Sequence, residues 1–277
     1  MNFIKKLHFT HSRWRIFIHA IVGLAAVLLA YCAGFQTAEH SGGKAVCTLD
    51  DLTDVPDVIP TQAQEVGIDP ELKRVFLTFD DGPSKNTEKV LQILADNQVT
   101  ATFFVVAADN NLDYLPLVKR ESEQGCQVAL HSCTHSYRQI YSSTDAFWTD
   151  IEELKKHLSE YLDISTIDCI RFPGGSTNTV SRKYGGSGIM KQLKKQAEER
   201  GYHWVDWNVC AEDAAGGKPS ADQIYRNVIQ GAKDKKDCVV LMHDTAATGN
   251  TIEALPDIIR WFKENGYTFY TISELYR

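Results

Sequence analysis

From Arg74 onward, short apolar segments alternate with longer amphipathic segments along the chain. The apolar segments have the length of strands, and the amphipathic ones carry apolar residues at helical spacing. We predict strands over residues 75–79, 102–106, 128–131, 167–172, 202–209, 238–242 and 267–272, and helices over residues 87–97, 114–124, 145–162, 191–200, 221–232 and 252–264. Strands that alternate with helices form a parallel sheet, because a parallel connection needs a long crossover.

The number of strands indicates the class of α/β fold. About seven parallel strands favour a distorted (β/α) barrel over an open, doubly wound sheet. No Gly-x-Gly-x-x-Gly follows the first strand, so the main signal for a nucleotide cofactor is absent from the sequence. Because barrel enzymes build their sites at the carboxyl ends of the strands, the residues that follow each predicted strand are the candidates for chemistry.

An apolar run over residues 16–35 precedes this domain. His19 is its only strongly polar side chain, and basic residues are concentrated in residues 1–15. The run is long enough to cross a membrane as a helix. The next basic residue is Lys44, so the positive-inside rule predicts a cytoplasmic N-terminus and an extracellular catalytic part at the cell membrane. The alternative is a cleaved signal peptide and secretion.

The remainder divides into a linker and one domain. Residues 36–69 are rich in Ser, Gly, Asp, Pro and Thr, which predicts a flexible linker that spans ~30 Å. Residues 70–277 form the predicted catalytic domain. The formal net charge of -7 argues against nucleic acid as a partner. The cysteines outside the apolar run are compatible both with disulfides and with small buried side chains: Cys47, Cys126, Cys133, Cys169, Cys210 and Cys238.

The first predicted strand ends in Thr-Phe-Asp-Asp-Gly-Pro, which contains Asp80 and Asp81. Neighbouring strand residues face opposite ways, but the Gly-Pro turn that follows can rotate the backbone so that both carboxylates enter one site. By itself, this tetrapeptide is an ordinary turn. Its interpretation therefore depends on what the other strand ends carry.

The third predicted strand ends in His-Ser-x-x-His, with His131 and His135 four residues apart. The two imidazoles share one side if the chain turns helically after the strand. Two histidines and one carboxylate with open positions form a ligand set for a catalytic metal. We interpret Cys133, which lies between them, as a packing residue.

Three further strand ends carry polar residues. Arg171 follows the fourth strand and can pair with one of the first-strand aspartates, and Gly174 can bring a backbone N–H close to a reacting oxygen. The fifth strand contains Asp206 and leads to Asp213, and the sixth ends in His243. Titratable groups in five successive motifs, each at the carboxyl end of a predicted strand, indicate a catalytic site.

These residues resemble the polysaccharide deacetylases, the NodB-homology domain of carbohydrate esterase family four. The resemblance covers residues 74–275 through T-F-D-D-G-P, H-S-x-x-H, R-F-P-G-G, W-N-V-x-x-x-D and L-M-H, in the family's order. It implies metal-dependent hydrolysis of N-acetyl groups on an extracellular amino-sugar polymer. With the predicted anchor, the chain is similar to membrane-anchored peptidoglycan N-acetylglucosamine deacetylases. Deacetylation of chitin-type oligomers and acetyl xylan esterase activity are the alternatives.

The resemblance also implies roles for single residues. Asp80 would be the general base, oriented by Arg171. His243 would be the general acid, tuned by Asp213, with Asp206 as the second candidate.

The resemblance places one divalent metal on Asp81, His131 and His135. Zn²⁺ is the default because histidine ligands and an open position suit it, and Co²⁺ or Mn²⁺ could replace it. No nucleotide cofactor is expected.

Around the reacting group, the resemblance assigns the oxyanion N–H to Gly174 and an apolar wall for the acetyl methyl group to Leu241. The sequence departs from the family's pattern at Gly174, where an aromatic residue is more common. It departs again at Ala214, which replaces a tryptophan of the substrate groove, and Trp207 could compensate for that loss.

Two other classes of protein share parts of this pattern. A metal set of two histidines and one carboxylate also serves non-haem iron oxygenases, but that reading leaves the base, the arginine and the acid without a purpose. A glycan-binding protein of the same fold without activity is the non-enzyme alternative. The complete set of base, ligands and acid favours the enzyme.

Overall fold

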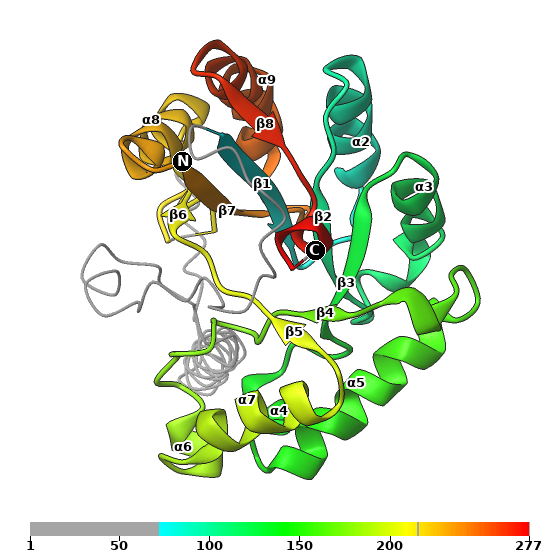
Figure 1. Cartoon of the computed structure of the whole chain (residues 1–277). Helices are drawn as coiled ribbons and strands as arrows, with labels where there is room; N and C mark the ends of the chain where they lie inside the picture. Colours follow the sequence, from blue (N-terminus) through cyan, green and yellow to red (C-terminus); the bar gives the residue numbers. More distant parts are fainter. Residues whose placement is uncertain (1–71, 215, 277) are drawn as a thin grey trace, which may run out of the picture. The chain divides into compact units, whose positions relative to one another are not determined.

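The computed structural model of the chain describes residues 72–214 and 216–276 (Figure 1). The predicted membrane segment, residues 16–35, and the predicted linker, residues 36–69, lie outside the described residues, as do Cys32 and Cys47. Within the described part of the chain, no helix has both the length and the apolar character of a membrane span.

A single parallel sheet organises the described residues. Its strands are β1 (Lys73–Asp80), β2 (Thr102–Val106), β3 (Gln127–Ser132), β4 (Cys169–Ile170), β5 (His203–Trp204), β6 (Val209–Cys210), β7 (Asp237–His243) and β8 (Tyr267–Phe269). They follow the order β5-β4-β3-β2-β1-β7-β6, and β8 also pairs with β1. β1 is central because it is paired on both edges: β7 pairs along one edge, and on the other edge β8 pairs with the first residues of β1 and β2 with its last. The predicted α/β fold with parallel strands is confirmed.

The sheet curls into a barrel that stays open between its two end strands, β5 and β6. We predicted one strand over residues 202–209, and this prediction was wrong: two short strands flank residues 205–208. Val205 still donates its N–H to Ile170 of the β4 side, whereas Asn208 donates its own to Val239 of β7. The chain therefore changes partner strands within four residues, which is why the barrel is distorted.

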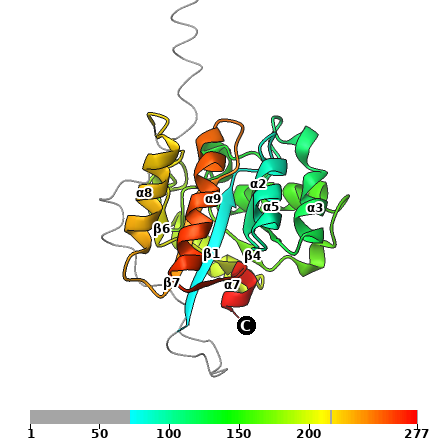
Figure 2. The same cartoon turned by 90° about the horizontal axis from the view of Figure 1, so that it is seen from above.

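The helices pack around the outside of the sheet (Figures 1 and 2). They are α2 (Thr87–Asp96), α3 (Leu117–Glu123), α4 (Tyr137–Ile140), α5 (Thr144–Leu158), α6 (Arg182–Gly185), α7 (Ile189–Glu199), α8 (Ala221–Ala232) and α9 (Gly249–Glu264), with short 3₁₀ helices η2 (Leu112–Tyr114), η3 (Ile164–Thr166) and η4 (Ile272–Leu275). The sequence pattern had indicated neither α4 nor α6, because one turn is too short to show periodicity.

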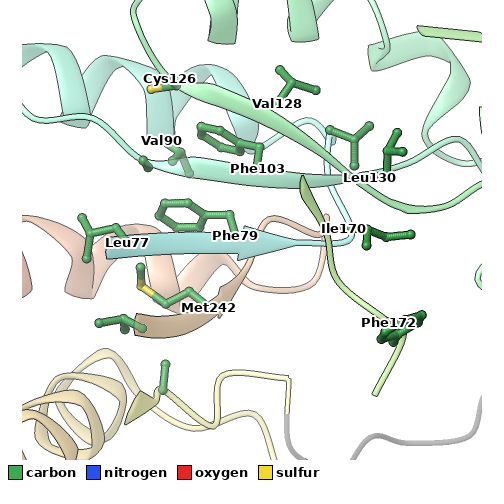
Figure 3. Packing of buried hydrophobic residues seen from close by; sticks show 14 of the residues in the cluster. Leu77, Phe79, Val90, Phe103, Cys126, Val128, Leu130, Ile170, Phe172 and Met242 are labelled. Carbon is green, nitrogen blue, oxygen red and sulfur yellow. The ribbon is translucent and has the colours of Figure 1, made fainter. Parts of the chain in front are cut away.

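Alternate residues of the strands build two separate apolar layers. Leu77 and Phe79 of β1 face the helices, and Figure 3 shows Phe79 packed against Phe103 with Val90 of α2 beside them. The inner layer fills the barrel and consists of Phe76, Phe104, Ala129, Cys169, Val205, Val239 and Ile272. Full burial of each large apolar side chain contributes ~1.5–3 kcal/mol.

The inner face of the barrel leads directly to the candidate site. Side chains of a strand alternate between faces, so the residue two positions after an inner-layer residue points the same way. Asp80, His131, Arg171 and His243 follow the inward-facing positions of β1, β3, β4 and β7 in this manner. All four therefore meet at the carboxyl end of the barrel.

Candidate active site

Asp80 and Asp81 both turn into the site at the end of β1. Asp81 has φ = 68°, a left-handed conformation that reverses the alternation of the strand. Such a backbone costs ~1–3 kcal/mol in a residue with a side chain and needs support. Asn111 provides it, because its amide donates to the carbonyls of Asp81 and Pro83 at 2.9 Å each. Gly82 must lack a side chain, since a Cβ would lie 2.8 Å from Asp244 Oδ2.

Asp81, His131 and His135 form a candidate metal triad. Asp81 Oδ1 lies 3.4 Å from His131 Nε2 and 3.2 Å from His135 Nε2, and the three ligand atoms are all within 4.8 Å of one another. Asp81 Oδ1 is buried and accepts no hydrogen bond among the described residues. A buried oxygen without a donor, facing two imidazole nitrogens, fits a divalent cation with histidine and carboxylate ligands.

The two imidazoles are oriented for such a cation. His131 Nδ1 lies 2.7 Å from the carbonyl of Arg171, so Nδ1–H donates there and the lone pair of Nε2 is left for a metal. Burial lowers the pKa of His135, which favours its neutral form. For His131 burial acts in the same direction, but Asp80 and Asp81 outweigh it and raise the pKa. The carboxylates thus attract positive charge to the place where a cation would bind.

The Asp81 carboxyl is itself anionic. Burial pushes its pKa upward, but the neighbouring histidines, His135 first and then His131 and His243, outweigh burial and hold the pKa below its ordinary range. An ionised carboxylate is the form that binds a metal.

Arg171 fixes the second carboxylate, Asp80. The guanidinium is fully buried, donates to Asp80 Oδ1 at 2.7 Å and to Thr78 Oγ1 at 2.8 Å, and lies over the Phe104 ring at 4.1 Å. Asp80 Oδ2 remains on the metal side, 3.7 Å from His131 Nε2. Removing one partner of such a buried ion pair typically lowers the free energy of unfolding by ~3–5 kcal/mol, because the other charge stays buried without a partner.

His243 ends β7, which pairs with β1 on the edge away from β3 and β4, so His243 and Arg171 approach the triad from opposite sides. His243 pairs with Asp213. Its Nδ1 is 2.8 Å from Asp213 Oδ1, while its backbone N–H and the Thr251 hydroxyl each donate to Asp213 Oδ2 at 2.8 Å. Burial lowers the pKa of His243, but the charge and hydrogen bond of Asp213 raise it to about 10. The Asp213 carboxylate therefore favours the protonated form of the imidazole.

Asp206, the other candidate for this partnership, lies elsewhere. Its carboxylate accepts the backbone N–H of Ser176 at 2.8 Å and the Ser176 hydroxyl at 2.6 Å. It therefore holds the segment after Gly175 rather than the imidazole of His243.

Comparisons with known proteins place this site in a family. Residues 67–188 match the polysaccharide deacetylase family. A peptidoglycan-N-acetylglucosamine deacetylase of Bacillus cereus is 32% identical over 209 residues, which cover 74% of this chain and 71% of that protein. The chain belongs to the polysaccharide deacetylase family. The resemblance inferred from the sequence motifs is confirmed, and the chain is classed with deacetylase hydrolases.

Two further relatives illustrate the range of this family. The catalytic domain of a peptidoglycan N-acetylglucosamine deacetylase from Eubacterium rectale is 40% identical with a TM-score of 0.70, over 75% of this chain and 92% of that one. A bifunctional xylanase/deacetylase of Pseudobutyrivibrio xylanivorans is 32% identical over 212 residues, which cover 74% of this chain but 30% of that protein.

Three further predicted site residues of this polysaccharide deacetylase lie in the segment after β4, in the segment before β6 and within β7. Gly174 has φ = 77°, and a Cβ there would lie 2.6 Å from the Tyr137 hydroxyl oxygen, so no side chain fits. Trp207 is half-buried and packs over Gly175. Leu241 is buried, two residues before His243 and on the same face of β7.

Ala214 is exposed, directly after the buried Asp213. No large side chain therefore stands at the position where the family more often has tryptophan.

One residue that positions the candidate metal ligands of the deacetylase was missed by the sequence analysis. Asp150 of α5 accepts hydrogen bonds from the Ser132 hydroxyl, the Cys133 N–H and both the N–H and hydroxyl of Thr134, at 2.7–2.9 Å. It thereby holds the segment between His131 and His135. A signal was present, because Asp150 interrupts the apolar stripe of its helix: Phe147, Ile151, Leu154 and Leu158.

Cys133 of this segment is buried in the apolar cluster, as predicted for a packing residue. The described cysteines form no disulfide with one another.

Proposed function

We propose that this deacetylase hydrolyses the N-acetyl groups of peptidoglycan N-acetylglucosamine and releases acetate. One observation carries the proposal: a candidate metal triad lies between a carboxylate held by an arginine and a histidine paired with a carboxylate. Amide hydrolysis needs a base for water and an acid for the leaving amine, and these two pairs offer them. The relatives named as peptidoglycan deacetylases support the choice of polymer.

The metal is part of the proposal. A divalent cation on Asp81, His131 and His135, Zn²⁺ by default, would supply Lewis acidity, polarising the acetyl carbonyl and acidifying water. Asp80 then takes the proton of the attacking water on Oδ2, because Arg171 occupies Oδ1.

The second half of the reaction uses His243. Asp213 binds Nδ1, so the proton on Nε2 is the one available to the departing amine nitrogen. The N–H of Gly174 donates to the carbonyl oxygen as it becomes an oxyanion.

Metal content tests the ligand assignment. We expect about one equivalent of divalent metal in the native protein and a large loss in His135→Ala, because two ligands hold a cation poorly. His157→Ala is the matched control, since His157 lies on α5 at a partly exposed position. Equal metal content in all three proteins would overturn the assignment.

We also propose that the catalytic domain acts outside the cell, held near the membrane by residues 16–35 and a linker with a reach of ~30 Å. Such a tether suits a substrate in the adjacent wall. Protease added to intact protoplasts should digest the catalytic domain. A domain found free in the medium would instead support the cleaved signal peptide.

A substrate panel decides between polymers. The bifunctional xylanase/deacetylase relative favours acetyl xylan as the second candidate, and chitin-type oligomers are the third. We would compare kcat/KM for acetate release by the full-length chain on peptidoglycan fragments, N-acetylglucosamine oligomers and acetylated xylan. A preference for xylan above about tenfold, ~1.4 kcal/mol in transition-state binding, would overturn the peptidoglycan proposal. Glycan binding without acetate release would support the inactive alternative.

A further inference from the structure

The segment after Arg171 forms a type II turn over residues 172–175. The Gly175 N–H donates to the Phe172 carbonyl at 2.7 Å, which closes the turn. Pro173 stands at its second position, where the ring holds φ negative, and Gly174 at its third position has φ = 77°. A positive φ at the third position after a negative one is the signature of type II.

The central peptide group of this turn joins the Pro173 carbonyl to the Gly174 N–H. In a planar trans peptide, the C=O and N–H point in opposite directions. Type I and type II turns differ mainly by a rotation of about 180° of this one group. The Pro-Gly pair favours the type II orientation, and a hydrogen bond to the Pro173 carbonyl holds the peptide group, and with it the Gly174 N–H, in that orientation.

Tyr141 holds that carbonyl. Its hydroxyl donates to Pro173 O at 2.8 Å, and its side chain is fully buried. Tyr141 directly follows α4, the single helical turn that begins two residues after His135. The hydrogen bond thus connects the metal-ligand segment to the turn, across 32 residues of sequence.

The Gly174 N–H, at the other end of the same peptide group, is available to a ligand. It donates to no acceptor among the residues that the structure describes. Gly174 is also partly exposed, whereas Phe172, Pro173 and Gly175 are buried. The packing of the Tyr137 hydroxyl oxygen against Gly174 keeps this position free of any side chain.

We propose that Tyr141 is a positioning residue, whose hydroxyl holds the Pro173–Gly174 peptide in the orientation that presents the Gly174 N–H to the developing oxyanion. The inference rests on the deacetylase activity proposed above and names the residue that sets one of its donors. Without the hydroxyl, the peptide group can rotate, which removes a donor from the oxyanion and turns a carbonyl oxygen toward it. Because the charge develops in the transition state, the effect falls on kcat rather than KM.

Tyr141→Phe in the full-length, metal-loaded chain tests this role. We expect metal content and KM to stay close to native values, and kcat to fall by about tenfold up to the 10²–10³-fold that the loss of one oxyanion donor costs. The loss should be equal on an N-acetylated glycan and on an activated aryl acetate, because both reactions pass through an oxyanion.

Tyr267→Phe is the matched control. Its hydroxyl also donates to backbone carbonyls, those of Ala232 at 3.3 Å and Lys235 at 2.5 Å, but on β8, outside the site. Both variants should unfold at a lower temperature than the native protein, and only Tyr141→Phe should lose kcat at a temperature where all are folded. Native kcat in Tyr141→Phe, or a loss confined to the amide substrate, would overturn the proposal.

A structure of Tyr141→Phe gives a second readout that needs no turnover. The Pro173–Gly174 peptide group should no longer be held in one orientation, with a second conformer that has a negative φ at Gly174. A single, fully occupied type II turn like the native one would overturn the proposal even if kcat fell. Aryl acetate cleavage by the native chain without activity on peptidoglycan would instead refute the proposed polymer and leave the role of Tyr141 testable.

Discussion

His243 and Asp244 are consecutive residues, but their side chains lie in two different buried regions. His243 belongs to the catalytic region and pairs with Asp213. Asp244 faces the other way, where its Oδ2 accepts a hydrogen bond from Thr87 and its Oδ1 has no partner among the described residues. Glu121 of α3 belongs to this second region, is fully buried and has no hydrogen bond to either carboxyl oxygen from any described residue.

The two regions raise pKa values for opposite reasons. Asp213 raises the pKa of His243 because it stabilises the charged imidazolium. Burial raises the pKa of Asp244 to about 7 because it destabilises a carboxylate, and Thr87 and Ser84 offset this in part. Burial, followed by the charge of Asp244, raises the pKa of Glu121 well above its usual range. Burial disfavours the charged form of a side chain in both regions. Only a partner of opposite charge, as Asp213 is for His243, favours the charged form in spite of burial.

The largest difference between the regions should appear in turnover. Asp80→Asn removes the proposed base and should lower kcat by about 10²–10⁴-fold while the metal stays bound. Glu121→Gln, an equally conservative change in the second region, should leave kcat near its native value. Rates at a temperature where both variants are folded, with metal content, make the test. Metal loss in Asp80→Asn would mean that the roles of Asp80 and Asp81 are exchanged.

His243→Ala sharpens the comparison within the catalytic region. Loss of the acid should lower amide cleavage by about 10²–10⁴-fold, and cleavage of an activated aryl acetate by much less, because a phenolate leaves without a proton. Asp80→Asn should reduce both reactions, since both need an activated water. Equal losses on the two substrates in His243→Ala would show that His243 is not the acid.

Asp150 extends the comparison, because it is a buried carboxylate satisfied by hydrogen-bond donors rather than by a cation. Asp150→Asn replaces one acceptor oxygen by a donor and leaves N–H or hydroxyl groups unpaired. We expect the free energy of unfolding to fall by about 2–3 kcal/mol. Glu153→Gln, on the exposed side of the same helix, should change it by less than about 0.5 kcal/mol. Denaturant unfolding curves of Asp150→Asn and Glu153→Gln that coincide with each other would contradict the proposed role of Asp150.

The smallest effect on turnover is expected in the second region, where the change concerns the pH dependence of stability. Glu121 and Asp244 bind protons in the folded protein at a pH where the unfolded chain has released them. Stability from these groups is therefore present below pH ~4 and is lost as pH rises toward 7 for Asp244, by up to ~1.4 kcal/mol per pH unit for each proton. Glu121→Gln should flatten this decline.

Melts of Glu121→Gln and native protein between pH 4 and 8 measure the difference. Glu123→Gln is the control, because Glu123 lies on the same helix and is exposed. Native-like pH dependence in Glu121→Gln would show that Glu121 finds a partner that keeps it ionised.

The sequence predicted the layers of the fold because they depend on local periodicity. The predicted strand over residues 75–79 and helix over residues 87–97 correspond to β1 and α2, and Asp80 and His131 stand at the ends of β1 and β3 as the motifs indicated. The predicted strand over residues 202–209 failed for a non-local reason. Its middle changes partners from β4 to β7, and the backbone carbonyls of Val205 and Asp206 bind Arg171. Apolar pattern carries no information about partner strands.

The sequence by itself determined which chemical groups stand at the carboxyl ends of the strands, because motif order and strand period are written along the chain. The tertiary structure alone decided which of them meet. Asp213 rather than Asp206 pairs with the His243 imidazole, and the Tyr141 hydroxyl donates a hydrogen bond to the carbonyl of Pro173. It also left both carboxyl oxygens of Glu121 without a hydrogen bond from any described residue. A hydrogen bond depends on distances of a few ångströms between groups that lie tens of residues apart, and only the packing of the barrel sets those distances.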